Sequence, residues 1–498
     1  MGPVKRVLLG SAAGMFAVAG AQAADLPVKA KPVEYVKVCS LYGAGFWYVP
    51  GTDTCIKIGA YTKIDMEYNA DGGGGPIGNN NGTGGQQTRV NTSNFTMRNR
   101  NDISVDMRSQ TEYGTLRSYI DIGSQIQHSG GAGGSVSSAN GASAIYVTRA
   151  FLQFAGFTTG RMRSFFDMYF QGSYTIASQR MNGDSSPNGI NGLAYTYQFG
   201  GGLSASLSLE DGGFGTGGHG RSTANLTGGG AIAFPADGTA NRIDVKGQQF
   251  PDIVGNLRLD QAWGFVGLSG AIHDASGGYY GATTVTGHPS DKFGWAAAAA
   301  FTLTNAFGMQ GDTVGAMAVY TRGASGYATT NVTQNTFYGS GNNVALGWSG
   351  DGIYSAAGGG IELTDVWSFN GAYDHRWDPK WRTSIYGGLV GVIYSDGAKN
   401  LICPGGSGGT PSPVGLGFTG GVTNCSPNWN ASQLGSRTLW NPVPDVDIGF
   451  DLSWYHMNTA FAGQANLPQN GARPGGTYSI SNQDVVSAFF RFQRNFLY

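Results

Sequence analysis

Charged residues are scarce in this chain, and neither sign is in excess. Only 12% of the 498 residues are charged, whereas about a quarter are charged in an average soluble protein. The 30 basic residues nearly match the 31 acidic ones, so the sequence lacks the basic surface with which proteins bind nucleic acid. No nucleic-acid partner is therefore expected.

Long apolar runs are missing as well. Beyond the N-terminus, no segment approaches the about 18 uninterrupted apolar residues that a membrane-spanning helix needs. The N-terminus places Lys5 and Arg6 before a small and apolar run at residues 7–20, followed by the cleavage pattern Ala21-Gln22-Ala23. Residues 1–23 are therefore predicted to be a signal peptide that is removed on export.

Cysteine is rare, with four residues in the chain. By spacing they form two local pairs, Cys39 with Cys55 and Cys403 with Cys425, and neither a CxxC spacing nor a neighbouring histidine completes a zinc site. In an exported chain these pairs are predicted to be disulfides, and free buried thiols are the alternative. Closing a loop of about 15 residues contributes about 3 kcal/mol in the chain-entropy view. No metal and no cofactor are expected.

Catalytic motifs occur only in contexts that do not support them. Gly405 to Gly409 matches GxSxG, but no strand before it and no helix after it would form a nucleophile elbow. Gly215 to Gly220 matches GxGxxG and equally lacks a strand-to-helix context. The six histidines show no HExxH spacing, and His375, beside Asp374 and Trp377, is interpreted as a histidine at a strand end. The chain is not expected to be an enzyme.

What the sequence has in abundance is glycine, with 84 residues, together with 12% aromatic residues. This composition favours many strands joined by large loops. The length would suffice for two or three ordinary domains, yet no linker divides the chain and no repeat of 20–50 residues is found. One large closed sheet accounts for both observations.

Alternation with a period of two is the main structural signal. In the terminal segment Val485 to Tyr498, apolar residues such as Val486 and Phe490 share one face, whereas Ser487 and Arg491 share the other. Other segments also carry charge on one face too often for a packed core. A strand with an apolar outer face, a polar inner face and a terminal aromatic residue is typical of an outer-membrane barrel.

About sixteen such segments are predicted. They span residues 55–68, 95–109, 113–126, 144–155, 157–162, 190–199, 202–210, 252–261, 263–273, 293–304, 312–322, 366–376, 380–394, 431–441, 445–457 and 483–498. Short and long connections alternate without a break, which predicts an all-β, antiparallel, up-and-down transmembrane barrel with both termini on the periplasmic side. Residues 24–54 would form a periplasmic N-terminal segment and residues 55–498 the barrel.

Two details of this prediction have open alternatives. The alanines of Trp295 to Phe301 favour a helix by intrinsic propensity, but the flanking residues favour a strand. Six tryptophans near segment ends are predicted to form an interfacial girdle, and buried core indoles are the alternative. They are Trp263, Trp367, Trp377, Trp381, Trp440 and Trp454.

Four stretches resemble the alphaproteobacterial porins of the rhizobial and Brucella type. They are VEYVKVCSLYGAGFWYVPGTDTCIKIGAY at residues 33–61, FAGFTTGRMRSFFDMY at 154–169, FPDIVGNLRLDQAWG at 250–264 and RFQRNF at 491–496. The resemblance implies a trimeric, sixteen-stranded, water-filled channel in the outer membrane, surrounded by lipid and lipopolysaccharide, through which small hydrophilic solutes and ions diffuse passively. The chain departs from this family at Leu497-Tyr498, which extend beyond the more usual terminal phenylalanine.

The resemblance also implies that the third long loop, from about Arg163 to Gly189, folds into the barrel. A loop that covers the mouth or packs at a trimer contact is the alternative. Inward-facing arginines and opposed loop carboxylates are expected to form the constriction and to set up a transverse field. The predicted constriction residues are Arg98, Arg100, Arg108, Arg117, Arg149, Arg161, Arg163, Asp167 and Asp184, with Asp102, Asp106 and Asp121 interspersed on the wall.

Three other functions compete with a general channel. A substrate-specific outer-membrane channel would share the same fold, since selectivity depends on where loop side chains meet. A barrel-borne hydrolase would need a catalytic set, and the motifs above do not supply one. A secreted β-sandwich adhesin would bury apolar faces and keep charge out of its interior, which disagrees with the arginine and aspartate rows.

Overall fold

The computed structural model describes most of the chain beyond its N-terminus. The described residues are 38–68, 95–127, 144–177, 180–181, 183–185, 189–212, 219–226, 244–281, 283–329, 336–340, 342–355, 359–404, 421–467 and 475–496. The predicted signal peptide and the terminal Leu497-Tyr498 lie outside these residues. No helix in the described ranges is long and apolar enough to cross a membrane.

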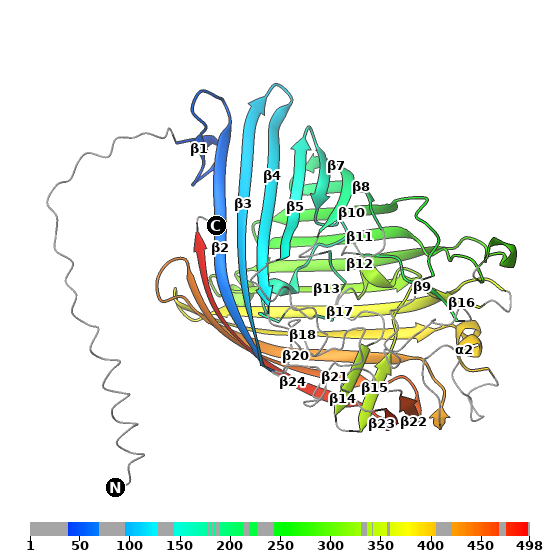
Figure 1. Cartoon of the computed structure of the whole chain (residues 1–498). Helices are drawn as coiled ribbons and strands as arrows, with labels where there is room; N and C mark the ends of the chain where they lie inside the picture. Colours follow the sequence, from blue (N-terminus) through cyan, green and yellow to red (C-terminus); the bar gives the residue numbers. More distant parts are fainter. Residues whose placement is uncertain are drawn as a thin grey trace, which may run out of the picture.

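Within the described residues, sixteen strands form one closed antiparallel barrel (Figure 1). They are β2 (Cys55–Tyr68), β3 (Phe95–Thr111), β4 (Gly114–Gln127), β5 (Ala144–Phe154), β6 (Phe157–Met162), β7 (Ile190–Gly200), β8 (Leu203–Glu210), β10 (Asp252–Gln261), β11 (Gly264–Asp274), β12 (Phe293–Thr304), β13 (Thr313–Arg322), β17 (Glu362–Arg376), β18 (Trp381–Tyr394), β20 (Trp429–Trp440), β21 (Val446–Asn458) and β24 (Gln483–Phe496). The ring closes where β24 pairs with β2, with Ala60 opposite Phe496. The predicted fold class is confirmed.

The two faces of each strand meet different surroundings. Exposed and buried residues alternate along β12, so its alanine run is a strand and its small side chains point alternately out and in. On β24, Val486, Phe490 and Phe492 are exposed on the outside, whereas Ser487 is buried on the inside. An apolar outer face and a polar inner face are what a barrel in a lipid bilayer requires.

The predicted aromatic girdle agrees with the exposure of the indoles. Five of the six tryptophans are exposed in the isolated chain, and Trp367 is half-buried. Trp381 and Trp440 stack at the turn end of β18 and β20, with ring centroids 5.7 Å apart. Tryptophans packed in a core would be shielded from solvent in the isolated chain. The exposure of these indoles therefore favours the interfacial girdle over buried core positions.

Short turns join the strands at one end of the barrel, and long loops join them at the other. In the two-residue turn between β5 and β6, Ala155 and Gly156 both have positive φ angles, of 49° and 86°. This left-handed pair matches the twist of a two-residue hairpin, and glycine is the residue that adopts it without strain. The N-terminal end of β2 and the C-terminal end of β24 lie at this turn side, as the alternation of short and long links predicts.

The described part of the N-terminal segment packs against the start of β2. It contains η1 (Ser40–Tyr42) and β1 (Trp47–Tyr48), and β1 pairs antiparallel with β2. Cys39 is joined to Cys55 there, and Cys403 is joined to Cys425, with Cα–Cα distances of 6.1 and 5.9 Å. Both predicted disulfides are therefore present.

The long loops carry secondary structure that the sequence did not predict. They contain η2 (Gln171–Ser173), β9 (Thr223–Asn225), η3 (Thr284–Thr286), η5 (Ser325–Tyr327), β14 (Thr336–Ser340), β15 (Asn343–Gly347), β16 (Gly352–Tyr354), α2 (Asp396–Ile402), β19 (Val422–Asn424), β22 (Ala462–Leu467) and β23 (Gly476–Ile480). A further 3₁₀ turn, η4 (Ala306–Gly308), lies in the short link between β12 and β13. A second, five-stranded sheet joins β14, β15, β23, β22 and β19 near α2 at the loop end (Figure 1).

Helix α2 begins at a hydrogen-bonded cap. The Ser395 hydroxyl accepts a hydrogen bond from the backbone N–H of Ala398 at 3.0 Å, which satisfies one of the free donors at the helix start. The same hydroxyl donates to Glu362 Oε2 on β17 at 2.6 Å. The cap thus fixes the loop that carries the Cys403–Cys425 disulfide to the barrel wall.

Candidate functional site

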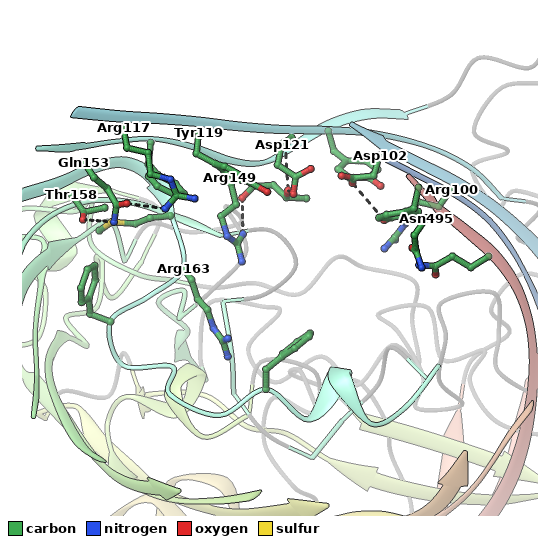
Figure 2. A pocket seen from close by; sticks show the side chains of 18 residues that line it. Arg100, Asp102, Arg117, Tyr119, Asp121, Arg149, Gln153, Thr158, Arg163 and Asn495 are labelled. Carbon is green, nitrogen blue, oxygen red and sulfur yellow. Dashed lines mark hydrogen bonds between the residues drawn. The ribbon is translucent and has the colours of Figure 1, made fainter. Parts of the chain in front are cut away.

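A cavity of about 720 Å³ lies inside the ring of strands, between one side of the wall and the loop that follows β6 (Figure 2). Its walls come from β2 to β6, from β24 and from the first residues of the loop. The lining residues are Tyr61, Arg100, Asp102, Arg117, Tyr119, Asp121, Tyr146, Thr148, Arg149, Phe151, Gln153, Thr158, Met162, Arg163, Phe165, Phe170, Gln493 and Asn495.

The loop from Arg163 to Gly189 bonds in turn to several strands of the wall. Near its start, Ser164 donates to Glu210 at the end of β8 at 2.6 Å. Asn256 on β10 and Ser269 on β11 then donate to the carbonyl oxygens of Phe165 and Phe166, at 2.7 and 3.0 Å. These polar wall residues replace the hydrogen bonds that the loop backbone would otherwise make with water.

Farther along, the loop is held by Asp451 on β21. Its Oδ2 accepts hydrogen bonds from the Thr175 hydroxyl at 2.7 Å and from the Ile176 N–H at 2.6 Å. Its Oδ1 accepts from the Tyr386 hydroxyl on β18, and all three side chains are buried. One carboxylate therefore clamps the loop to β21, the neighbour of the cavity-lining strand β24.

Four of the seven predicted arginines line the cavity: Arg100, Arg117, Arg149 and Arg163. Arg100 donates to Gln125 Oε1 from Nε at 3.0 Å, and Arg117 donates to both carboxylate oxygens of Asp106 at 2.9 and 3.0 Å. Arg149 on β5 and Arg163, just after the end of the neighbouring strand β6, extend side by side into the opening (Figure 2). The structure thus brings together the arginines that alternate along the inner face of β3, β4 and β5.

The other three predicted arginines lie elsewhere. Arg98 is buried in the wall, where it forms ion pairs of 3.0 Å with Asp65 and Glu67 on the neighbouring strand. Arg108 lies at the turn side, where it pairs with Asp106 at 2.7 Å and lies over the ring of Phe46 from the N-terminal segment. Arg161 donates to the carbonyl oxygen of Val147 at 2.9 Å and is not among the lining residues.

The two loop carboxylates that the sequence suggested for the constriction are buried inside the loop structure. Asp167 accepts hydrogen bonds from the backbone N–H and the hydroxyl of Ser185. Asp184 pairs with Arg180 at 3.2 Å. Neither is among the cavity-lining residues, and the carboxylates that do line it, Asp102 and Asp121, belong to the same wall as the arginines.

A buried network of histidines and carboxylates was not recognised in the sequence. His219 faces Asp167 with Nε2 3.2 Å from Oδ1, and its ring stacks on Tyr327 with centroids 3.9 Å apart. The Tyr327 hydroxyl donates to Asp252 at 2.8 Å. His273 lies between Asp252 and Asp351, at 2.7 and 3.3 Å. The network joins three long loops to β10 and β11, and single histidines in glycine-rich loops give no periodic signal that would reveal it.

Opposite charges keep the loop pair of this network ionised. Burial alone would raise the pKa of Asp167, but the facing His219 and the hydrogen bond from Ser185 hold that pKa below its ordinary value. Burial alone would lower the pKa of His219, but Asp167 and the Gly326 carbonyl oxygen raise it above its ordinary value. The pair therefore behaves as an ion pair between two loops near neutral pH.

The remaining candidates for chemistry have structural partners. His375 contacts Asp312 at 2.7 Å and packs edge-on against Trp377 at the turn end of the barrel, as a strand-end histidine. No group of three or more His, Cys, Asp or Glu side chains in the described part of the chain is arranged to hold a metal ion. The Gly405 to Gly409 motif lies outside the described residues.

Comparison with known families identifies the family to which this closed barrel belongs. The sequence profile of the porin subfamily matches residues 25–489. The chain belongs to this family. The resemblance to the alphaproteobacterial porins that the sequence motifs indicated is thereby confirmed.

Individual relatives of this porin are distant. Porin Omp2b of Brucella suis biovar 1 (strain 1330) is 31% identical over 269 residues, which cover 53% of this chain and 64% of the relative. Porin Omp2b of Brucella abortus (strain 2308) is 30% identical over 268 residues, with the same shares of the two chains. The match thus spans just under two thirds of these relatives' length.

A solved structure supports the fold. The outer membrane channel DcaP of Acinetobacter baumannii aligns with a TM-score of 0.54 at 13% identity, over 90% of this porin and 99% of that chain. At this identity the likeness concerns the architecture of the barrel and says nothing of its solutes.

Proposed function

We propose that this porin forms a water-filled channel in the outer membrane, through which small hydrophilic solutes and ions diffuse passively. The observation that carries the proposal is the closed ring of strands with an apolar outside and a cavity of about 720 Å³ inside, lined by charged, polar and aromatic side chains. Hydrated solutes cross such a lumen without any conformational cycle, because ordered water and fixed charges replace part of their hydration. Membership of the porin subfamily supports the same function.

The loop after β6 is the element that would narrow the channel. Its hydrogen bonds to Glu210, Asn256 and Ser269 on one side and to Asp451 on the other support a path across the lumen. The constriction would then lie between the loop and the arginine-bearing wall of β3 to β5. Arg100, Arg117, Arg149 and Arg163 are the members of the predicted set best placed to act on passing ions.

Reconstitution into planar bilayers tests the channel. Purified protein is expected to add stepwise, voltage-independent conductance at low potential, and to let sugars enter liposomes at rates that fall with sugar size. A saturable preference for one sugar would instead indicate a substrate-specific channel. Absence of conductance from protein that retains its strand content would contradict the proposal.

The processing and assembly of the chain are part of the same proposal. We propose a mature chain that begins near Ala24 and assembles as a homotrimer embedded in lipid and lipopolysaccharide, on the pattern Ala21-Gln22-Ala23 and on the resemblance to trimeric porins. Intact mass spectrometry of protein extracted from outer membranes in detergent is expected to find three copies lacking residues 1–23. A monomer, or a chain that retains its leader, would contradict one part or the other.

A further inference from the structure

We infer that the cavity beside the loop prefers anions and holds a subsite for aromatic carboxylates, centred on Arg163. The inference rests on the proposed channel and names the class of solute that its constriction favours. It depends on three features of the described residues: the sign of the charge around the cavity, the surroundings of Arg163, and the aromatic rings that accompany the arginines.

The charge around the cavity is predominantly positive. Four arginines line it against two carboxylates, Asp102 and Asp121, and those two lie on the arginine-bearing wall. The loop contributes the expected cation, Arg163, to the cavity lining. Its own carboxylates, Asp167 and Asp184, are engaged with Ser185, His219 and Arg180 away from the opening. The cavity is therefore expected to repel cations and to attract anions.

Arg163 is the arginine best suited to bind a solute. Its Nη2 donates one hydrogen bond, to the carbonyl oxygen of Tyr169 at 3.0 Å. Among the described residues its guanidinium forms no ion pair with a carboxylate. Its Nε is buried and has no hydrogen-bond partner, so a solute in the cavity would bind the terminal nitrogens. By contrast, Arg117 already forms a two-point ion pair with Asp106. A planar carboxylate offers the two acceptors that a guanidinium fork binds best.

Aromatic rings lie directly beside these cations. The Arg163 guanidinium lies 5.2 Å from the ring centroid of Phe170, and Phe165 and Phe170 both line the cavity. On the wall, Arg117 lies 5.3 Å from the ring of Phe151 and Arg100 lies 5.5 Å from that of Tyr146. A solute with a carboxylate on a flat ring would bind the guanidinium at one end and stack at the other. Chloride or acetate has no ring to stack and would interact with the guanidinium charge alone.

The test is single-channel recording of the complete protein in planar bilayers. In asymmetric KCl the reversal potential is expected to show chloride preference over potassium. Benzoate added at constant ionic strength is expected to reduce the current at lower concentration than acetate does, while benzyl alcohol, which has the ring without the charge, leaves it unchanged. Benzoate and acetate acting at equal concentration would overturn the subsite, and cation preference would overturn the anion field.

Variants localise the effect. Arg163→Gln is expected to raise the benzoate concentration needed for half-block roughly tenfold, the cost of one charged hydrogen-bonded contact. Phe170→Ala is expected to bring benzoate close to acetate while leaving the chloride preference in place. Arg322→Gln removes the same charge from the exposed end of β13, beside Asp365, and is expected to change neither value. An equal change in Arg322→Gln and Arg163→Gln would contradict the assignment, whereas absence of any channel would contradict the proposed function instead.

Discussion

Replacement of Asp451 by alanine is expected to release the loop after β6 from the wall and to give larger, noisier single-channel currents. Two loop donors, the Thr175 hydroxyl and the Ile176 N–H, lose their acceptor, whereas the Tyr386 hydroxyl keeps Ser453 as a partner. Each buried donor without a partner costs roughly 1–3 kcal/mol, so the anchored state of the loop becomes several kcal/mol less favourable. The bonds of the same loop to Glu210 and Asn256 would remain, so the released part is its middle.

Two further variants make this test specific. Asp451→Asn keeps one oxygen for Thr175 and Ile176 and is expected to restore most of the wild-type conductance. Asp484→Ala removes a carboxylate that binds Trp454 and His456 at an exposed site, and is expected to leave the currents unchanged. Limited proteolysis in detergent provides a second measurement, with faster cleavage between Arg163 and Gly189 in Asp451→Ala alone. Wild-type currents in Asp451→Ala would show that this carboxylate does not hold the constriction.

The strands of this porin could be predicted closely because period-two alternation is a local signal. The predicted segment at 252–261 coincides with β10, and that at 293–304 coincides with β12 despite its alanine run. The largest misplacement is the start of β17, which begins at Glu362 where the prediction began at residue 366. Its first residues pair with β16 from within a long loop, so no change of pattern marks the boundary.

The loop sheet could not be predicted in the same way. Its strands are short, and β15 pairs in parallel with β23, more than a hundred residues farther along the chain. Such pairings depend on where the barrel brings the loop bases together, and the sequence of any one loop does not contain that information. The parallel pairing of β16 with β9 has the same origin.

At the site, sequence predicted which face of each strand is polar, but the role of each charge depends on its neighbours. Arg98 lies directly across from Asp65 in the register of β2 and β3, so it is neutralised within the wall. Arg100 lies one inward position farther along β3 and reaches the cavity. The loop carboxylates were expected to face the opening because the resemblance to porins implies that this loop folds into the barrel and opposes the arginines of the wall. Asp167 instead binds donors from two loops, which no local pattern reveals.

The ion pair between His219 and Asp167 is expected to hold their two loops together most strongly in mildly acidic solution. Its contribution to the stability of the loops is expected to decrease at lower and at higher pH. The pKa of His219 is raised by Asp167 once burial is overcome, so its contribution is complete below the ordinary histidine value and is lost as the pH rises through the raised pKa. The pKa of Asp167 is lowered, so its contribution is complete above the ordinary carboxyl value and is lost as the pH falls through the lowered pKa. Both contributions are complete between about pH 4 and pH 6.5.

The measurement is hydrogen exchange of the loop segments around Asp167 and His219 in detergent, corrected for the intrinsic pH dependence of exchange. Protection is expected to fall at alkaline pH in the wild type, and His219→Gln is expected to lower it at every pH and to abolish the alkaline decline. Removing one partner of a buried ion pair costs roughly 3–5 kcal/mol, which is enough to change protection by several orders of magnitude.

His456→Gln, at a half-buried site beside exposed Asp484, serves as the control. Glu210, Arg163 and the neighbouring cluster of His273, Asp252 and Asp351 also face this region, and they remain in place in His219→Gln. An alkaline decline that survives that substitution unchanged would assign the pH dependence to them rather than to the His219–Asp167 pair.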